Sequence, residues 1–331
     1  MAERALLIAA GGGIGDTLLA TVVAQALKTR FASVDALVRP EHREIVERTP
    51  AVAGVELFDA SAWRVGMRLR PQSYAASVTT WATGATALAP LVAGIPVRVG
   101  QARRLYSRLF TKQVVVRSEL GDNTTHWTEI LLDYARALDC DLAEPMPRFV
   151  PTASDEREAQ ELLAAYGIAE PSIVLHPTRG LSAERARWPL VGFVTLARAL
   201  RERGPVLVTG SATDAHIANG IAELAGPGVV SVAGATTVGV FGALAASVRA
   251  VVTMDSGPMH IAAAVGAPTV GIFALQSDEP DRWAPRGPHV ATVRATYPCP
   301  PGERKETCPD FACVAHLDVP AILAQLDTLL P

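Results

Sequence analysis

The chain has 331 residues, of which 49% are hydrophobic and 19% are charged, and its formal net charge at pH 7 is −3. So many apolar side chains can form sizeable cores, which excludes global disorder, and the near-neutral charge excludes a whole-chain basic surface for nucleic acid. The 4 cysteines are too few for a disulfide scaffold and are compatible with a reducing compartment.

Alternating strands and helices are predicted for the first half of the chain. Short β-branched and apolar runs predict strands at 5–10, 34–38, 55–58, 75–80 and 114–116. Apolar side chains that recur on one helical face predict a helix over 17–30, and a second helix is predicted over 127–138. Prolines within 142–151 indicate a linker to a second domain.

The second half repeats this alternation. Strands are predicted at 173–176, 206–209, 229–232, 250–254 and 269–273, and helices at 190–203, 214–225, 238–247, 259–265 and 319–330. Such alternation is typical of parallel sheets covered by helices on both faces. We therefore predict an α/β protein with two Rossmann-like domains, 1–150 and 151–318, whose parallel sheets face a central cleft, followed by a C-terminal helix at 319–331.

The first predicted strand leads into a glycine loop, Gly11-Gly-Gly-Ile-Gly-Asp-Thr17. A dinucleotide-binding loop would need glycine at position 16, where a carboxylate would repel the pyrophosphate, and no Gly-Lys-Ser/Thr follows for a Walker A loop. These observations disfavour an NAD oxidoreductase. Two interpretations of Asp16 remain: a helix N-cap, or a carboxylate presented at the carboxyl end of a strand, where open α/β sheets bind their ligands.

A second motif, Asp255-Ser-Gly-Pro-Met-His260, follows the predicted strand 250–254. Pro258 suits the first position of a helix, because its missing N–H is no loss there. The N–H groups of Gly257, Met259 and His260 would then form an anion site at the helix N-terminus. Taken alone, such a helix start is also consistent with a purely structural role.

Together these motifs closely resemble the bacterial heptosyltransferases, glycosyltransferase family nine. The resemblance extends over essentially the whole chain and rests on Gly15–Thr21, Leu91–Gly100, His176–Thr178, Arg187–Pro189 and Asp255–His260. It implies a GT-B fold and an inverting, metal-independent sugar transfer that requires no cofactor. The implied donor is a nucleotide-diphosphate sugar, ADP-heptose above all, and the implied acceptor is the inner core of lipopolysaccharide.

The resemblance also implies roles for individual residues. Asp16 becomes the general base on the acceptor hydroxyl, and Gly13 and Gly15 lie beside the acceptor. Donor contacts fall on Thr178, Asp214, Thr236, Asp255, Ser256, Gly257 and His260. Ala186 stands where the family has a lysine for the donor phosphate, so the flanking Arg185 and Arg187 become the candidates for that charge.

Positive charge is concentrated in the first half. The stretch from Ala60 to Ser118 contains no Asp or Glu, and its cations are Arg64, Arg68, Arg70, Arg98, Arg103, Arg104, Arg108, Lys112 and Arg117. One interpretation is a solvated face with extended arginines. The interpretation we favour is an electropositive acceptor domain for an anionic glycolipid, with Arg98, Arg103 and Arg104 as the contacts.

A weak metal-site candidate lies near the end of the chain, where Cys299, Cys308, Cys313 and His316 follow one another. Their spacing is not a standard zinc pattern, so reduced cysteines and no metal are the favoured expectation.

No targeting or membrane-spanning segment is predicted. The N-terminus has no cleavage site, and the uncharged stretches 71–97 and 229–248 are too rich in glycine, proline and hydroxyl side chains to span a bilayer. We expect a soluble cytoplasmic protein with peripheral contact at the cytoplasmic face of the inner membrane. Two other functions stay open: a nucleotide-sugar epimerase of GT-B fold, and a catalytically silent nucleotide-sugar or glycolipid-binding protein.

Overall fold

A computed structural model describes residues 3–169, 172–178, 188–275, 279–298, 308 and 310–330. The chain divides into two compact units, Met1–Val150 and Pro151–Pro331, which we call the first and second units. Each unit contains one six-stranded sheet in which every pair of neighbouring strands is parallel. The predicted α/β class with two parallel sheets is therefore confirmed.

The sheet of the first unit has the strand order β3-β2-β1-β4-β5-β6. Its strands are β1 (Arg4–Ile8), β2 (Ser33–Val38), β3 (Gly54–Leu57), β4 (Ala76–Thr79), β5 (Val97–Gln101) and β6 (Lys112–Val114). The chain winds outward from β1 to β3 and then returns to β4 on the other side of β1. The order of strands thus reverses between β1 and β4, the place at which open α/β sheets form ligand sites.

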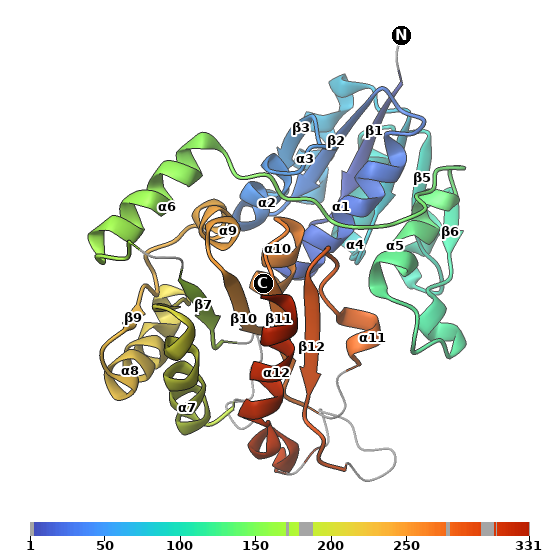
Figure 1. Ribbon diagram of the computed structural model, residues 1–331. Helices are drawn as coiled ribbons and strands as arrows, with labels where there is room; N and C mark the ends of the chain where they lie inside the picture. The colour runs from blue at the N-terminus through green and yellow to red at the C-terminus, as the bar shows by residue number, and fades with distance from the viewer. Residues whose placement is uncertain are drawn as a thin grey trace. The chain divides into compact units, whose positions relative to one another are not determined.

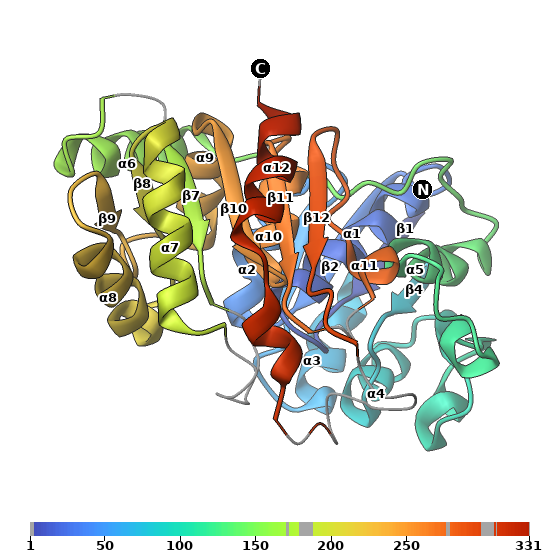
Figure 2. The same ribbon diagram turned by 60° about the horizontal axis from the view of Figure 1, so that its bottom comes forward.

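Two groups of helices cover this sheet. Helix α1 (Ile14–Leu27) packs against α2 (Arg43–Glu47) and α5 (Trp127–Arg136), and on the opposite face α3 (Ala62–Leu69) packs against α4 (Gly84–Val92) (Figures 1 and 2). Gly66 allows the close approach of α3 to α4, because a Cβ there would lie 2.6 Å from the Ala89 carbonyl oxygen. The core under α3 and α4 includes the buried side chains of Leu6, Ile8 and Val65.

The second unit repeats the winding with the strand order β12-β11-β10-β7-β8-β9. Its strands are β7 (Ile173–His176), β8 (Val206–Val208), β9 (Val229–Ser231), β10 (Ala250–Met254), β11 (Thr269–Phe273) and β12 (Val290–Arg294). Here the order of strands reverses between β7 and β10. Both units therefore have the same topology, and each has one such switch point.

Helices cover both faces of this second sheet as well (Figure 1). One group comprises α7 (Leu190–Leu200), α8 (Ala215–Ala225) and α12 (Val319–Leu329), and its core includes the fully buried Leu196, Ile221 and Ile322. The other comprises α6 (Ala153–Ala165), α9 (Val238–Ser247) and α10 (Gly257–Ala264), while α11 (Pro280–Trp283) is a short helix after β11. Across the described residues, none of the helices is long and apolar enough to cross a membrane.

Several elements differ from their predictions. The sequence pattern predicts neither strands β5 and β12 nor helices α2, α3, α4, α6 and α11. The strand predicted at 114–116 lies instead at Lys112–Val114, and the helix predicted at 17–30 begins at Ile14. Helix α4 was missed because Pro90 lies inside it, which usually breaks a helix, and its packing against α3 outweighs that local cost.

Candidate active site

The glycine loop of the first unit lies at the switch point between β1 and β4. The loop leaves β1 and starts α1, and Gly12 has a φ of +78°, a backbone conformation that favours glycine. A Cβ on Gly11 would clash with the carbonyl oxygen of Trp81, which follows β4. The loop is therefore built of glycine because the backbone after β4 passes directly against it.

Asp16 lies in the first turn of α1 and is half-buried. Of the two interpretations of Asp16, that of an N-cap is wrong: the cap is Gly13, and the Asp16 carboxylate accepts a hydrogen bond of 2.7 Å from the Gly13 N–H, as in a capping box. Burial raises the pKa of Asp16 above its ordinary value, and the hydrogen bond from Gly13 opposes that rise. A carboxylate with a raised pKa is a stronger base than a free one.

A hydrogen-bond network supports this loop. Arg39 donates through Nη2 to the Gly12 carbonyl oxygen (2.7 Å) and to His42 Nε2 (3.2 Å). Since arginine only donates, the His42 proton resides on Nδ1, which donates to Thr17 Oγ1 at 2.7 Å. Burial and the charge of Arg39 lower the pKa of His42, so its imidazole ring takes part in this network in the neutral form. The network ties Gly12 and the start of α1 to the segment after β2.

The second motif begins α10 at the switch point of the second unit. Ser256 is the N-cap, Gly257 is the first helical residue, and Pro258 is the second position rather than the predicted first. The Met259 N–H donates to the Ser256 carbonyl oxygen (3.1 Å), so the prediction that it is free for an anion is wrong. Gly257 remains a donor candidate, because the N–H of the first helical residue has no intrahelical acceptor.

His176 is the last residue of β7 and Thr178 follows it, directly beside β10, the strand that leads into the second motif. Buried His176 contacts Thr209 Oγ1 through Nδ1 (2.9 Å) and Thr178 Oγ1 through Nε2 (3.1 Å). Burial lowers the pKa of His176 to about 4, against an opposing effect of Asp214, so the ring is neutral at pH 7. The half-buried hydroxyl of Thr178 is thereby held in place at this edge of the sheet.

Asp214 and Thr236 follow the next two strands, β8 and β9. Asp214 begins α8 and accepts a hydrogen bond from Ser211 Oγ at 2.7 Å. The two loops are joined by the Gly234 N–H, which donates to the Gly210 carbonyl oxygen. The structure thus brings the described donor candidates, Thr178, Asp214, Thr236, Asp255, Ser256, Gly257 and His260, to the carboxyl ends of four strands adjacent in the sheet.

The three predicted acceptor arginines have different environments. Arg98 is half-buried and donates to the carbonyl oxygens of Ile95 (2.6 Å) and Leu109 (2.9 Å), which gives its guanidinium a structural role. Arg104 pairs with Glu119 at 2.6 Å. Arg103 is exposed, and it forms no ion pair with any described residue.

Other cations of the predicted basic face are also neutralised. Arg68 pairs with Asp59 at 2.9 Å, and Arg117 pairs with Asp133 at 2.6 Å. These carboxylates come from segments outside the stretch 60–118, so the separation of charges along the sequence is partly undone by the fold. Arg98 and Arg104 are therefore engaged with partners in their own unit, and their assignment to the acceptor stays a prediction.

The weak metal candidate is only partly described. Cys299 lies outside the described residues, as do the donor candidates Arg185 and Arg187. Cys308 accepts a hydrogen bond from the Phe311 N–H, and His316 stacks on Tyr297 with ring centroids 4.5 Å apart. In the part of the chain that the structure describes, no group of three or more His, Cys, Asp or Glu side chains is placed to hold a metal ion.

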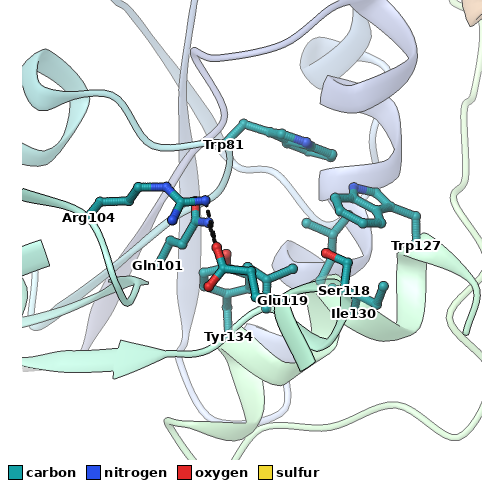
Figure 3. A pocket seen from close by; sticks show the side chains of 10 residues that line it. Trp81, Gln101, Arg104, Ser118, Glu119, Trp127, Ile130 and Tyr134 are labelled. Carbon is teal, nitrogen blue, oxygen red and sulfur yellow. Dashed lines mark hydrogen bonds and ion pairs between the residues drawn. The ribbon is translucent and has the colours of Figure 1, made fainter. Parts of the chain in front are cut away.

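The first unit also contains a pocket that the sequence analysis missed (Figure 3). Its volume is about 240 Å³, and it lies between the segment after β4, the end of β5 and helix α5. Its lining residues are Trp81, Gln101, Arg104, Val116, Ser118, Glu119, Trp127, Ile130, Leu131 and Tyr134. One signal was available in the sequence: Trp81 directly follows a predicted strand, at the end of the sheet where ligands bind.

Comparisons with known proteins agree with one another. The family model "Glycosyltransferase family 9 (heptosyltransferase)" matches residues 62–310. Lipopolysaccharide heptosyltransferase 2 of Escherichia coli strain K12 is 25% identical over 310 residues, which is 87% of each chain. A family 9 glycosyl transferase of Veillonella parvula has a TM-score of 0.86 at 16% identity, covering 99% of this chain and 97% of its own. The structure of E. coli ADP-heptose lps heptosyltransferase II has a TM-score of 0.78 at 23% identity, covering 98% of this chain and 99% of its own. The likeness to these structures confirms the predicted GT-B fold.

Proposed function

The chain belongs to glycosyltransferase family 9 and is a glycosyltransferase, and from this premise we propose that it moves a heptose or a related sugar from an ADP-sugar to an anionic glycolipid such as the lipopolysaccharide inner core. The proposed reaction inverts the sugar carbon and uses no metal and no cofactor. The observation that carries the proposal is that the glycine loop lies at the switch point of the first sheet, and the motifs His176–Thr178 and Asp255–His260 lie at that of the second. Because the acceptor is a membrane glycolipid, we expect the enzyme to act at the cytoplasmic face of the inner membrane.

The donor is assigned to the second unit. The start of α10 suits the diphosphate, because a helix N-terminus presents N–H groups and a partial positive charge to an anion. Asp214, which caps α8 after β8, suits the ribose hydroxyls, and its carboxylate already accepts one hydroxyl hydrogen bond from Ser211. Thr178 and Thr236 border the same edge of the sheet. For the donor phosphate we retain the proposal of Arg185 or Arg187.

The acceptor is assigned to the first unit, with Asp16 as the general base and Gly13 and Gly15 in its loop. In the proposed reaction the Asp16 carboxylate takes the proton of the acceptor hydroxyl, whose oxygen forms a bond to the sugar carbon. The bond from that carbon to the diphosphate oxygen breaks on the opposite side, and the diphosphate leaves with the electron pair. Arg103, exposed and without an ion pair among the described residues, is the arginine best suited to an anionic group of the acceptor.

The rate of transfer should depend on the protonation of Asp16. The base must be ionised, so kcat should fall as the pH falls through a pKa that lies above the ordinary aspartate value of about 3.9. Because the folded protein binds this proton more tightly than the unfolded chain, protonation of Asp16 favours folding, so the loss of rate should occur without any unfolding caused by this group. A pH–rate profile measured beside circular dichroism checks this, and a flat acid limb would contradict it.

A binding screen followed by an assay tests the proposed function. In a thermal-shift screen of nucleotide sugars, a donor at 100 times its Kd should stabilise the protein by about 2.7 kcal/mol, which raises Tm by several degrees. We expect ADP-sugars to give this shift and UDP-sugars to give none. Transfer to a lipopolysaccharide inner-core acceptor, followed by mass spectrometry, should persist in EDTA. Binding without transfer would favour a catalytically silent protein, and sugar isomerisation without acceptor would favour an epimerase.

A further inference from the structure

We propose that the pocket of the first unit binds one uncharged sugar ring of the acceptor, stacked on Trp81 and Trp127. This inference rests on the proposed function, because it assigns a substrate class to the acceptor half of that enzyme. It restricts the earlier expectation of an anionic acceptor: charged groups of the glycolipid lie outside this pocket, and the ring held inside it carries none.

The size of the pocket fits a single ring. Its volume of about 240 Å³ is below the roughly 300–1,000 Å³ of pockets that enclose drug-sized ligands. All of its lining residues belong to the first unit, and they come from the segment after β4, the end of β5 and the segment after it, the segment after β6, and α5. A ligand of one ring can therefore be enclosed here, while the rest of a longer glycan stays outside.

The apolar part of the pocket has the chemistry that stacks on a sugar. The rings of Trp81 and Trp127 have centroids 6.2 Å apart with an interplanar angle of 30°, and both border the pocket (Figure 3). An aromatic face is electron-rich, so it attracts the weakly positive C–H groups on one side of a pyranose. Ile130 and Leu131 of α5 continue this apolar wall.

The polar part of the pocket disfavours an anion. Glu119 Oε1 accepts hydrogen bonds from Arg104 (2.6 Å) and Gln101 Nε2 (2.9 Å), so the one arginine in the lining is already neutralised (Figure 3). Glu119 Oε2 is buried and accepts no hydrogen bond from the described residues. A carboxylate oxygen in this state needs a donor, which a sugar hydroxyl supplies and a carboxylate or phosphate does not.

The pocket adjoins the start of the loop that carries the proposed base. The backbone of Trp81 passes so close to Gly11 that no side chain fits between them, and Gly11 opens the loop that leads to Asp16. Figure 3 shows the hydroxyl of Ser118 directed toward the space between Glu119 and the tryptophan rings. A sugar ring held there would have polar partners at one end. At its other side it would meet the wall formed by Trp81, behind which the glycine loop begins.

Binding of simple glycosides to the full-length protein tests the proposal. The probes are the methyl pyranosides of glucose, galactose and mannose, and the methyl glycosides of the corresponding uronic acids, whose carboxylates are free and charged. Each is titrated into the protein and followed by ligand-observed NMR. We expect at least one neutral glycoside to bind about tenfold or more tightly than its uronate. Trp127→Ala should weaken that binding about tenfold or more. Trp63→Ala is the matched control, because Trp63 is 64% exposed on α3 and does not line the pocket; it should change nothing.

A charge variant tests the specificity separately. Glu119→Gln removes the carboxylate and leaves Arg104 unpaired, so it should reduce the preference for the neutral glycoside over the uronate by about tenfold. Uronates that bind the wild type as tightly as neutral glycosides would overturn the proposal, as would a panel in which no neutral glycoside binds. Circular dichroism of each variant checks that the first unit stays folded, and ADP affinity, measured by calorimetry, reports on the donor site of the second unit. Normal ADP binding without glycoside binding refutes the pocket alone, whereas glycoside binding without any nucleotide binding refutes the proposed function.

Discussion

Asp16→Asn is expected to lower the turnover of sugar transfer by about 10²-fold or more while nucleotide-sugar affinity stays unchanged. The reason is that asparagine has no basic oxygen for the acceptor proton, although its amide oxygen can still accept the 2.7 Å hydrogen bond from the Gly13 N–H. Single-turnover kinetics would measure the chemical step, and calorimetry with ADP would measure the donor site of the second unit. The substitution thus separates the proposed base from the capping role.

The chain offers a matched control for this experiment. Asp155 occupies the same third helical position in α6, where its carboxylate accepts a hydrogen bond of 2.7 Å from the Thr152 N–H. Asp155→Asn should leave turnover unchanged. Asp16→Ala, which removes both functions, should lose turnover and also about 0.5–2 kcal/mol of stability. If Asp16→Asn transfers sugar at nearly the wild-type rate, Asp16 is only part of a capping box and another group is the base.

The fold could be predicted well where burial dominates the sequence pattern. Strands β7, β10 and β11 begin and end at the predicted residues, because central strands of a parallel sheet are apolar on both faces and bounded by turn residues. The edge strand β12, Val290–Arg294, was missed because its half-buried residues alternate weakly. Helix α3 was missed because its arginines mask a short apolar face that packs on α4.

The candidate site could be predicted only where its residues are local in sequence. The glycine loop and the 255–260 motif each combine a strand end with a helix start, which is visible in a few consecutive residues. The pocket is different, because Trp81 and Trp127 come together only after β4 and α5 pack in one unit. The pairing of Arg104 with Glu119 was missed for a related reason, since the predicted basic stretch was considered without the acids beyond its ends.

Gly257→Val is expected to weaken the affinity for nucleotide sugars about 10- to 100-fold. Gly257 is the first residue of α10, so its N–H points out of the helix, and a hydrogen bond to a charged phosphate contributes about 1.5–3 kcal/mol. The two methyl groups of valine would occupy the space in front of that N–H and keep the diphosphate away. Because the Met259 N–H is already bonded to the Ser256 carbonyl oxygen, it cannot replace the lost donor.

Gly84→Val is the matched control for this last substitution. Gly84 is likewise the first residue of a helix, α4 in the first unit, and beyond its chain neighbours and the backbone of its own helix no described atom lies within 4 Å of where its Cβ would be. Gly84→Val should therefore leave the affinity for ADP and for ADP-sugars at the wild-type value in calorimetry. Gly257→Val should lower both affinities while its Tm stays unchanged. Since the same valine is added at the same helical position, a difference between the two variants isolates the anion site from any general cost of a branched residue there. If the two variants bind ADP and ADP-sugars with equal affinity, α10 is not part of the donor site, and the segment between β7 and α7 becomes the candidate for binding the diphosphate.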